Sequence, residues 1–525
     1  MSTGLNRRRF LGFSAGGAAA VMLGTGWWDT ASADTPKLSG HPFTLGVASG
    51  DPAHDSVVLW TRLAVDPLAA DGKGGMPDAT VPVQYQVAED ENFADVVKAS
   101  VAFATPELGH SVHPEVHGLR PHRHYWYRFR VGNEISAAGR TRTAPAPGSM
   151  PDALRFAYAS CANWAAGHYT AYGHLADEDL DLVVHLGDYI YEFGITTARG
   201  IRLPSHFATE CADLTRYRLQ YSLYKTDPNL QRAHAAFAWV NTFDDHEVED
   251  GYAGDRSKPD TEPDQDPAVF LRRRAEAYQA MYENLPLRHT QMPAGPDIRI
   301  HRRISYGSLA EFTMLDTRQY RSDQPCEGSS TTCDGRFDPN ATMLGAPQRE
   351  WLLNGLATSS SRWQIIGNQV PMAQTDRNPD PAVTEVWGDP WDGYVVERDA
   401  VLSTAPADNL VVITGDRHSN YVMDLKTSYT DPGARVVGTE FVGTSITTGG
   451  NGADTLPVGD GYLVANPHMR FCNFQRGYSR VTVTPDQLSN DFRVVPYVNQ
   501  PGAPVSTRAT FVVENGNPGA HIDTV

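Results

Sequence analysis

Positive charge, cysteine and long apolar segments are all scarce in this chain of 525 residues. Its 44 Lys and Arg are outnumbered by 62 Asp and Glu, which gives a net charge of −18 at pH 7. Such a negative surface argues against nucleic acid as a nonspecific partner, because contact with the phosphate backbone requires clustered Lys and Arg. It also repels anionic substrates, so a site for a phosphorylated substrate would need metal ions or a local group of arginines.

No segment beyond the N-terminus is apolar enough to cross a membrane. The N-terminus itself carries three arginines, Arg7 to Arg9, before a glycine-rich apolar run and a small-residue cleavage site, Ala31-Ser32-Ala33. This pattern is typical of a Tat-type signal peptide over residues 1–33, and an uncleaved anchor is the alternative. We therefore expect a secreted, extracellular protein that is exported by the Tat machinery and has no stable transmembrane anchor.

The five cysteines are an odd number, so at least one thiol is left unpaired. Cys326 and Cys333 flank a short polar loop, and we expect them to form a disulfide bond in an oxidising compartment. Cys161 is the expected free thiol because it follows a predicted strand, at a candidate site. The pairing of Cys211 and Cys472 stays open.

Composition predicts two folded domains after the signal peptide. Residues 40–145 resemble an all-β domain, in which a turn at 119–121 (LRP) precedes a Tyr-rich strand at 125–129. This corner resembles that of a fibronectin type III-like sandwich. After a linker at 144–148 (APAPG), residues 150–515 alternate short apolar runs with helical stretches, as expected of an α/β domain.

Within the second region we expect buried strands at the short apolar runs. These are Leu154–Ala159, Leu182–Leu186, Ala238–Thr242, Leu309–Leu315, Trp363–Ile366 and Leu410–Ile413. One helix is expected after Gly167 and another over Ala268–Glu283. The basic run Arg272 to Arg274 in the second helix is interpreted as a solvent-facing surface.

Polar side chains follow four of these strands. They are Ser160 with Cys161, Asp188 with Tyr191, Asp245 with His246, and Asp416 with His418. Ligands of open α/β sheets bind beyond the carboxyl ends of the strands, so four such ends favour a shared metal site. Each motif alone is weak, because Gly-Asp after a strand is common and a lone His there is usually structural. The prediction depends on their joint occurrence.

The order of these motifs resembles that of the calcineurin-like metallophosphoesterases. That superfamily carries Asp-x-His, Gly-Asp-x-x-Asp, Gly-Asn-His-Asp/Glu and Gly-His-x-His at successive strand ends. Here Cys161 stands in the first block, Tyr191 replaces the second Asp, Asp245 replaces the Asn and Asp416 replaces the first His. These departures match the alkaline phosphatase D (PhoD) branch, which includes secreted iron- and calcium-dependent phospholipases D.

Longer motifs carry the same resemblance over nearly the whole mature chain. They lie at 43–52 (FTLGVASGDP), 185–192 (HLGDYIYE), 244–249 (DDHEVE), 315–321 (LDTRQYR), 391–394 (WDGY) and 441–446 (FVGTSI). The resemblance implies an α/β fold with a calcineurin-like core of two packed mixed β-sheets flanked by helices, after a small β-sandwich. It also implies an enzyme that hydrolyses phosphoric ester bonds of diesters or monoesters, with phospholipase D activity as the alternative.

The resemblance further implies a ferric ion, Fe³⁺, and calcium, Ca²⁺, as cofactors. The iron ligands carried over by motif are Cys161, Asp188, Tyr191, Asp416 and His418. Asp188 would bridge to calcium, and Asp245 occupies a further calcium-binding position. A thiolate and a phenolate suit a trivalent transition metal, whereas carboxylate oxygens suit calcium. The alternatives are an inert buried thiol at Cys161 and a core aromatic at Tyr191.

By the same resemblance, His246 is the catalytic residue that protonates the leaving oxygen or stabilises the transition state, while a metal-activated hydroxide attacks. Asp244 and Glu247 are interpreted as supports of the ligands. Arg417 and Arg476 are possible phosphate binders that nothing in the sequence orients. A structural role for His246, and a surface-binding protein with a decayed enzyme domain, are the competing interpretations.

Overall fold

The computed structural model describes residues 36–259, 263–325, 330–331, 333–405, 409–431 and 433–524. The signal peptide and Cys326 lie outside these residues, so export and the Cys326–Cys333 bond stay predictions. Among the described cysteines, Cys161, Cys211 and Cys472 are free thiols. Every helix in the described ranges is too short or too polar to span a bilayer.

The described residues form two compact units, each discontinuous in sequence. Unit 1 takes its residues from Met1–Ala146, Glu192–Asn241 and Ala268–Arg299, and unit 2 takes them from Pro147–Tyr191, Thr242–Pro267 and Ile300–Val525. The contiguous domain boundaries at 40–145 and 150–515 stay predictions. The two later segments Glu192–Asn241 and Ala268–Arg299 belong to the same compact unit as the N-terminal β-strands, whereas the predicted division assigns them to the second domain.

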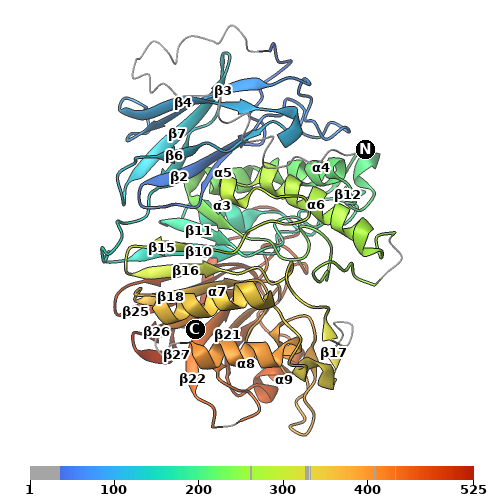
Figure 1. Cartoon of the computed structure of the whole chain (residues 1–525), viewed down its shortest axis with the longest axis vertical. Helices are drawn as coiled ribbons and strands as arrows, with labels where there is room; N and C mark the ends of the chain where they lie inside the picture. Colours follow the sequence, from blue (N-terminus) through green and yellow to red (C-terminus); the bar gives the residue numbers. More distant parts are fainter. Residues whose placement is uncertain are drawn as a thin grey trace. The chain divides into compact units, whose positions relative to one another are not determined.

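Unit 1 contains the expected β-structure. Its strands are β1 (Val47–Gly50), β2 (Ser56–Arg62), β3 (Val81–Ala88), β4 (Val96–Ala104), β5 (Ser111–Val112), β6 (Glu115–His117), β7 (His124–Val131), β8 (Glu134–Ile135), β9 (Gly139–Arg142), β12 (Thr197–Ala198), β13 (Ile201–Arg202) and β14 (Ala238–Asn241). One sheet has the order β4-β3-β7-β8, with β9 also paired to β7. In a second layer, β1 pairs with β14 in parallel and with β2 in antiparallel fashion, and β2 pairs with β5 and β6 (Figure 1).

The two layers of unit 1 share one apolar core, because alternate residues of each strand point inward. Val57 and Leu59 of β2 pack in the same cluster as Val83 of β3 and Phe129 of β7. The backbone N–H of Arg120 donates to the hydroxyl of Tyr125 at 2.8 Å, as in the tyrosine corner of fibronectin-like sandwiches.

The helices of unit 1 are α4 (Leu214–Lys225), α5 (Pro228–Ala236) and α6 (Pro267–Asn284). The prediction that Arg273 and Arg274 of α6 face solvent is wrong, since both side chains are buried. Arg273 Nε donates to the hydroxyl of Tyr217 at 3.0 Å, and Arg274 Nε donates to the carbonyl oxygen of Pro296 at 2.9 Å. Acceptors from other segments thus compensate the burial of both guanidinium groups.

Unit 2 is built on two mixed sheets. Its strands are β10 (Leu154–Ala159), β11 (Leu182–His185), β15 (Arg302–Tyr306), β16 (Ala310–Met314), β17 (Ser330–Thr331), β18 (Trp363–Asn368), β19 (Val386–Trp387), β20 (Leu410–Thr414), β21 (Asn420–Lys426), β22 (Val436–Val442), β23 (Met469–Asn473), β24 (Arg476–Val483), β25 (Gln487–Val495), β26 (Ser506–Glu514) and β27 (Asn517–Thr524). The strands of the first sheet that belong to this unit run β27-β26-β25-β24-β10-β11, and the second sheet runs β15-β16-β18-β20-β22-β21-β23.

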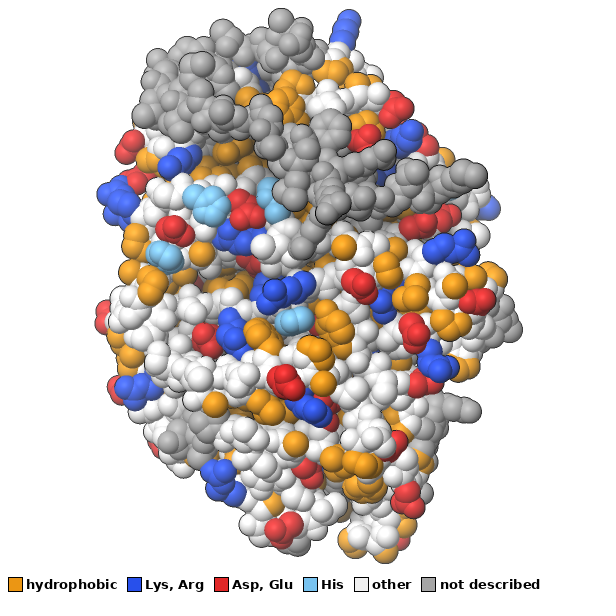
Figure 2. All heavy atoms as spheres, in the orientation of Figure 1, with side chains coloured by type: hydrophobic (Ala, Val, Ile, Leu, Met, Phe, Trp, Pro, Cys, Tyr) orange, Lys and Arg blue, Asp and Glu red, His pale blue; other side chains and the backbone are white. Residues whose placement is uncertain are grey.

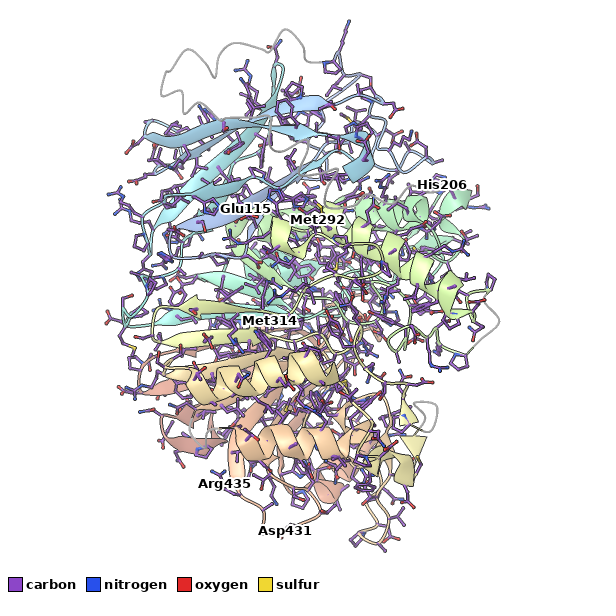
Figure 3. All side chains as sticks on the ribbon, viewed as in Figure 1. Glu115, His206, Met292, Met314, Asp431 and Arg435 are labelled. Atoms are coloured by element: carbon purple, nitrogen blue, oxygen red, sulfur yellow. The ribbon has the colours of Figure 1, made fainter. Side chains whose placement is uncertain are left out.

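These two sheets pack face to face. The rings of Phe156 on β10 and Phe312 on β16 lie 5.0 Å apart, and those of Phe471 on β23 and Phe492 on β25 lie 5.3 Å apart. Met314, labelled in Figure 3, ends β16 so close to Gly367 that a Cβ there would lie 2.5 Å from its sulfur. A larger residue at this point of β18 would therefore require the Met314 side chain to move.

Helices cover the outer face of the second sheet. They are α7 (Gly345–Thr358) and α8 (Val395–Thr404) (Figure 1). The other α-helices that lie among the described residues of unit 2 are α3 (Thr170–Ala176) and α9 (Pro457–Ala465). Leu352 of α7 and Val401 of α8 share an apolar cluster with Ile366 of β18 and Val412 of β20. This confirms the expected core of packed mixed sheets flanked by helices.

Candidate metal centre

The loops that follow β10, β11 and β22 are joined by main-chain hydrogen bonds. Cys161 N donates to Gly187 O at 3.1 Å, and Ala162 N donates to Asp188 O at 2.9 Å. From the loop after β22, Ile446 N donates to Ser160 O at 3.0 Å. Residues far apart in the sequence therefore meet beyond the carboxyl ends of the strands, where ligands of α/β sheets bind.

Several residues in the loops of this site have a strained, left-handed backbone conformation. Four of the ten described non-glycine residues with positive φ are candidate ligands: Cys161 (57°), Asp188 (54°), Asp416 (64°) and His418 (52°). A non-glycine residue in the left-handed region is held there at a cost of about 1–3 kcal/mol, and such residues cluster at functional sites.

The described residues contain two sets of three side chains that could hold a metal ion. Within each set, the three possible ligand atoms all lie within 4.8 Å of one another. The first set is Cys161, Asp188 and His418, and the second is Asp188, Asp245 and His246. Asp188 belongs to both sets, so its carboxylate is placed to be shared by two cations.

The hydroxyl of Tyr191 extends the first of these sets. It donates to Asp188 Oδ2 at 3.1 Å and lies 3.3 Å from His418 Nε2. The ring of Tyr191 packs against that of His246 with centroids 4.1 Å apart and the ring planes tilted by 33°. Asp416 is near enough for its charge to raise the pKa of Cys161. All seven residues proposed from the sequence are thus brought to one place.

The acidic groups here are buried and repel one another. Burial raises the pKa of Asp188 well above its usual value, and the charges of Asp245 and Asp244 add to this. Burial also raises the pKa values of Cys161 and Tyr191, and it raises that of Asp416 to about 6. In the absence of cations, burial favours the protonated forms of these groups, and a bound cation would favour their ionised forms instead.

Two further observations fit metal binding. Asp188 Oδ1 is buried and has no hydrogen-bond partner, which leaves it available to a cation. Burial, with a contribution from Arg476, lowers the pKa of His418 to about 3, so its imidazole is neutral and able to bind a metal. Thiolate, phenolate, carboxylate and imidazole together form a donor set suited to a transition metal next to a hard cation.

Arg318 lies in the motif at 315–321, but the sequence did not reveal its contacts with the candidate site. It is fully buried, and its Nε donates to Asp244 Oδ1 at 2.6 Å. Its Nη1 and Nη2 donate to the two carboxylate oxygens of Asp389 at 2.7 and 3.1 Å, and its Nη2 lies 3.7 Å from Asp245 Oδ2. Burial opposes ionisation of Asp245, but Arg318 and His246 hold its pKa below its usual value.

Thr448 was also missed, because no strand-end motif marks it. Its hydroxyl lies 2.8 Å from both the Tyr191 hydroxyl and the carbonyl oxygen of Cys161, so it braces two candidate ligands. Arg476 donates to the carbonyl oxygens of His418 and Gly450, and thereby holds the His418 loop. The guanidinium of Arg476 is therefore already used within the fold.

Comparison with known proteins identifies the family of this chain. The model of the PhoD-like phosphatase family matches residues 156–492, and the model of the PhoD-like phosphatase N-terminal domain matches residues 29–145. Alkaline phosphatase D of Bacillus subtilis (strain 168) is 45% identical over 529 residues, which cover 98% of this chain and 88% of that protein.

Solved structures show the same relationship. The structure of PhoD superposes with a TM-score of 0.88 at 45% identity and covers 94% of each chain. A purple acid phosphatase from yellow lupin (Lupinus luteus) seeds superposes with a TM-score of 0.55 at 13% identity, over 90% of this chain and 74% of that one, and so shares the fold alone. This chain belongs to the PhoD-like phosphatase family, a family of phosphoric ester hydrolases.

Proposed function

We propose that the protein is an exported, metal-dependent phosphoesterase that hydrolyses phosphodiesters and phosphomonoesters. The observation that carries this proposal is the placement of Asp188 in two ligand sets at once. Two cations that share one carboxylate lie close enough to hold a single phosphoryl group between them. The strained backbone at four of the candidate ligands supports the same conclusion.

We assign a ferric ion to the set that contains the thiol and the phenol. Its ligands are Cys161, Asp188, Tyr191, Asp416 and His418. Calcium is assigned to the carboxylates of Asp188 and Asp245, since hard oxygen ligands suit it. When bound, these ions supply positive charge for the phosphoryl oxygens and lower the pKa of a water molecule.

His246 is proposed as the general acid. Its side chain is partly exposed at the metal centre, and the adjacent Asp188 and Asp245 are buried. A hydroxide, formed when a water molecule has lost one proton to solvent, attacks phosphorus, and the ester P–O bond breaks. The leaving oxygen takes a proton from the protonated His246 imidazolium. The tilted ring contact with Tyr191 holds the His246 imidazole near the same centre.

The test is elemental analysis of the purified protein beside a panel of phosphate esters. We expect iron and calcium, turnover of bis(p-nitrophenyl) phosphate and p-nitrophenyl phosphate, and loss of turnover after chelation. A metal-replete preparation that turns over none of the esters would instead favour the non-enzymatic, surface-binding interpretation.

Phospholipase D activity is the second candidate, and the helix α9 favours it. Leu456 just before α9, and Val458, Leu463 and Val464 within it, are all exposed, Val464 at 67%. On its inner side Tyr462 packs against Tyr421, which lies three residues after His418. An exposed apolar surface on a helix that packs against the strand after His418 suits a substrate held in a lipid layer.

Two variants separate the lipid candidate from the soluble ester. We expect Leu463→Asp together with Val464→Asp to reduce headgroup release from phosphatidylcholine vesicles and to leave turnover of the soluble diester unchanged. Ile522→Asp is the matched control, because Ile522 on β27 is also exposed, at 49%, and lies on a different element of unit 2. If the wild type, the double variant and the control release headgroups from vesicles at the same rate, the exposed residues of α9 do not support phospholipase D activity.

Secretion is proposed from the twin-arginine signal. The acidic surface agrees with a soluble exported protein, and acidic and basic side chains are interspersed on the described face drawn in Figure 2. Lysines in place of Arg7 and Arg8 should block appearance in the culture medium. Unchanged secretion of that variant would contradict the Tat route.

A further inference from the structure

We propose that Glu247 is a positioning residue that fixes Asp188 in the conformation in which both cations can share it. This inference rests on the metal centre proposed above. Glu247 follows the candidate catalytic residue His246 in the sequence, yet its side chain points away from solvent and is 0% exposed. It acts through the backbone of its neighbours, not through contact with substrate.

The carboxylate of Glu247 accepts three main-chain hydrogen bonds from two loops. Oε1 accepts from Tyr189 N at 2.7 Å, and Oε2 accepts from Asp188 N at 3.1 Å. Oε2 also accepts from Asp244 N at 2.9 Å. The first two donors follow β11 and the third follows β14, so one carboxylate joins the two loops that carry the shared ligand and the second ligand set.

These bonds act on a backbone that is under strain. Asp188 has a φ of 54°, and the preceding Gly187 has a φ of 112°. A Cβ at Gly187 would lie 2.5 Å from Asp244 N, so the two loops approach too closely for a side chain at that position. Because Glu247 binds the N–H of Asp188 in this conformation, it stabilises the left-handed backbone that turns the Asp188 carboxylate toward both ligand sets.

Glu247 is not itself placed as a ligand, since both of its oxygens already accept N–H groups. Asp188 differs in this respect, because its Oδ1 is buried without a hydrogen-bond partner. The role of Glu247 depends on a carboxylate. In Glu247→Gln the amide NH₂ replaces one oxygen, so at least one buried N–H loses its acceptor and faces another donor.

Unit 2 offers a matched control in Glu440 of β22. Glu440 is also 0% exposed and accepts from Met372 N at 2.8 Å, from Ala373 N at 2.7 Å and from Thr414 Oγ1 at 2.6 Å. Neither N–H donor belongs to a candidate ligand. Glu440→Gln therefore removes the same kind of buried acceptor without touching the backbone of Asp188.

The experiment compares the full-length wild type with Glu247→Gln and Glu440→Gln. Iron content is measured on the isolated proteins, calcium affinity by titration with CaCl₂ after removal of calcium, and stability by thermal unfolding of the chelated proteins. We expect both variants to unfold at lower temperature. Only Glu247→Gln should lose iron and show calcium affinity weakened by about 10–100-fold, the range typical of residues that orient metal ligands.

Equal stability losses with wild-type metal binding in both variants would overturn the proposal and leave Glu247 a structural residue. If Glu247→Gln does not fold, Glu247→Asp serves the same purpose, because it keeps the charge but is too short to reach all three donors. Normal iron and calcium binding in a folded Glu247→Asp protein would then contradict the role. Absence of metal from the wild type itself would instead refute the proposed metal centre.

Discussion

Replacement of Asp188 by Asn tests the shared carboxylate most directly. It should weaken metal binding, and so lower the stability of the metal-loaded protein, but it should not lower the stability of the metal-free protein. The variant keeps the shape of the side chain and an oxygen that can accept from the Tyr191 hydroxyl, now at 3.1 Å. It removes one negative charge from both ligand sets at once. Any difference in metal binding then reports on that charge.

The magnitude follows from the burial of Asp188, which is 2% exposed. Removal of one partner from a buried ion pair costs about 3–5 kcal/mol, which corresponds to about 10²–10⁴-fold in metal affinity. In the metal-free protein, burial raises the pKa of Asp188 above its unfolded value. The folded metal-free protein therefore binds this proton more tightly than the unfolded chain does. As the pH rises above the pKa of the unfolded state, ionisation of Asp188 lowers the free energy of unfolding.

Asparagine carries no such penalty, so the chelated variant at pH 8 should be at least as stable as the chelated wild type, by up to about 3 kcal/mol. Below about pH 4 the two chelated proteins should converge, because the aspartate is then protonated in both states. Scanning calorimetry with and without metals, together with elemental analysis, measures these effects. Wild-type affinity for both metals in the variant, or a chelated variant clearly less stable than the wild type at pH 8, would refute the reasoning.

The remaining predictions concern three other residues. Cys161→Ala should lose iron, visible absorption and nearly all turnover, and retained iron with retained turnover would contradict its role as a ligand. His246→Ala should keep its metals but turn over phosphodiesters about 10²–10⁴-fold more slowly, whereas metal loss would make His246 a ligand. Burial, with a contribution from His289, lowers the pKa of His113 to about 3 from 6.5, so stability is full above pH 6.5 and is lost as the pH falls toward 3. The unfolding free energy of His113→Gln should therefore decrease less between pH 6.5 and pH 3 than that of the wild type, by up to about 5 kcal/mol. Urea denaturation at a series of pH values measures this, and the same pH dependence in both proteins would exclude it.

The strands of the catalytic core were predictable from the sequence because their apolar runs are nearly continuous. Such runs are typical of strands buried on both faces, and β10 has the predicted bounds, Leu154–Ala159. Since parallel strands present their carboxyl ends on the same edge, the strand-end positions of Cys161, Asp188 and Asp416 also indicated that they would meet. The resemblance to a known family added the roles.

Charge patterns were less informative because they do not show which acceptors lie nearby in space. The basic run of α6 was interpreted as solvent-facing, yet Arg273 and Arg274 are buried. Arg273 meets the hydroxyl of Tyr217, 56 residues earlier in the chain. Nothing in the local pattern distinguishes such an arginine from an exposed one.

The amino-acid order alone shows which residue types follow the strands, and these types indicate the class of candidate metal ligands. The contacts that hold these candidate ligands become visible only in the folded chain. Arg318 meets Asp389, 71 residues away, and Thr448 meets Tyr191, 257 residues away. Glu247 reaches the N–H of Asp188 only because two loops approach within hydrogen-bond distance. Hydrogen bonds and ion pairs require contacts of about 3 Å, and packing of the whole chain, not sequence spacing, sets such distances.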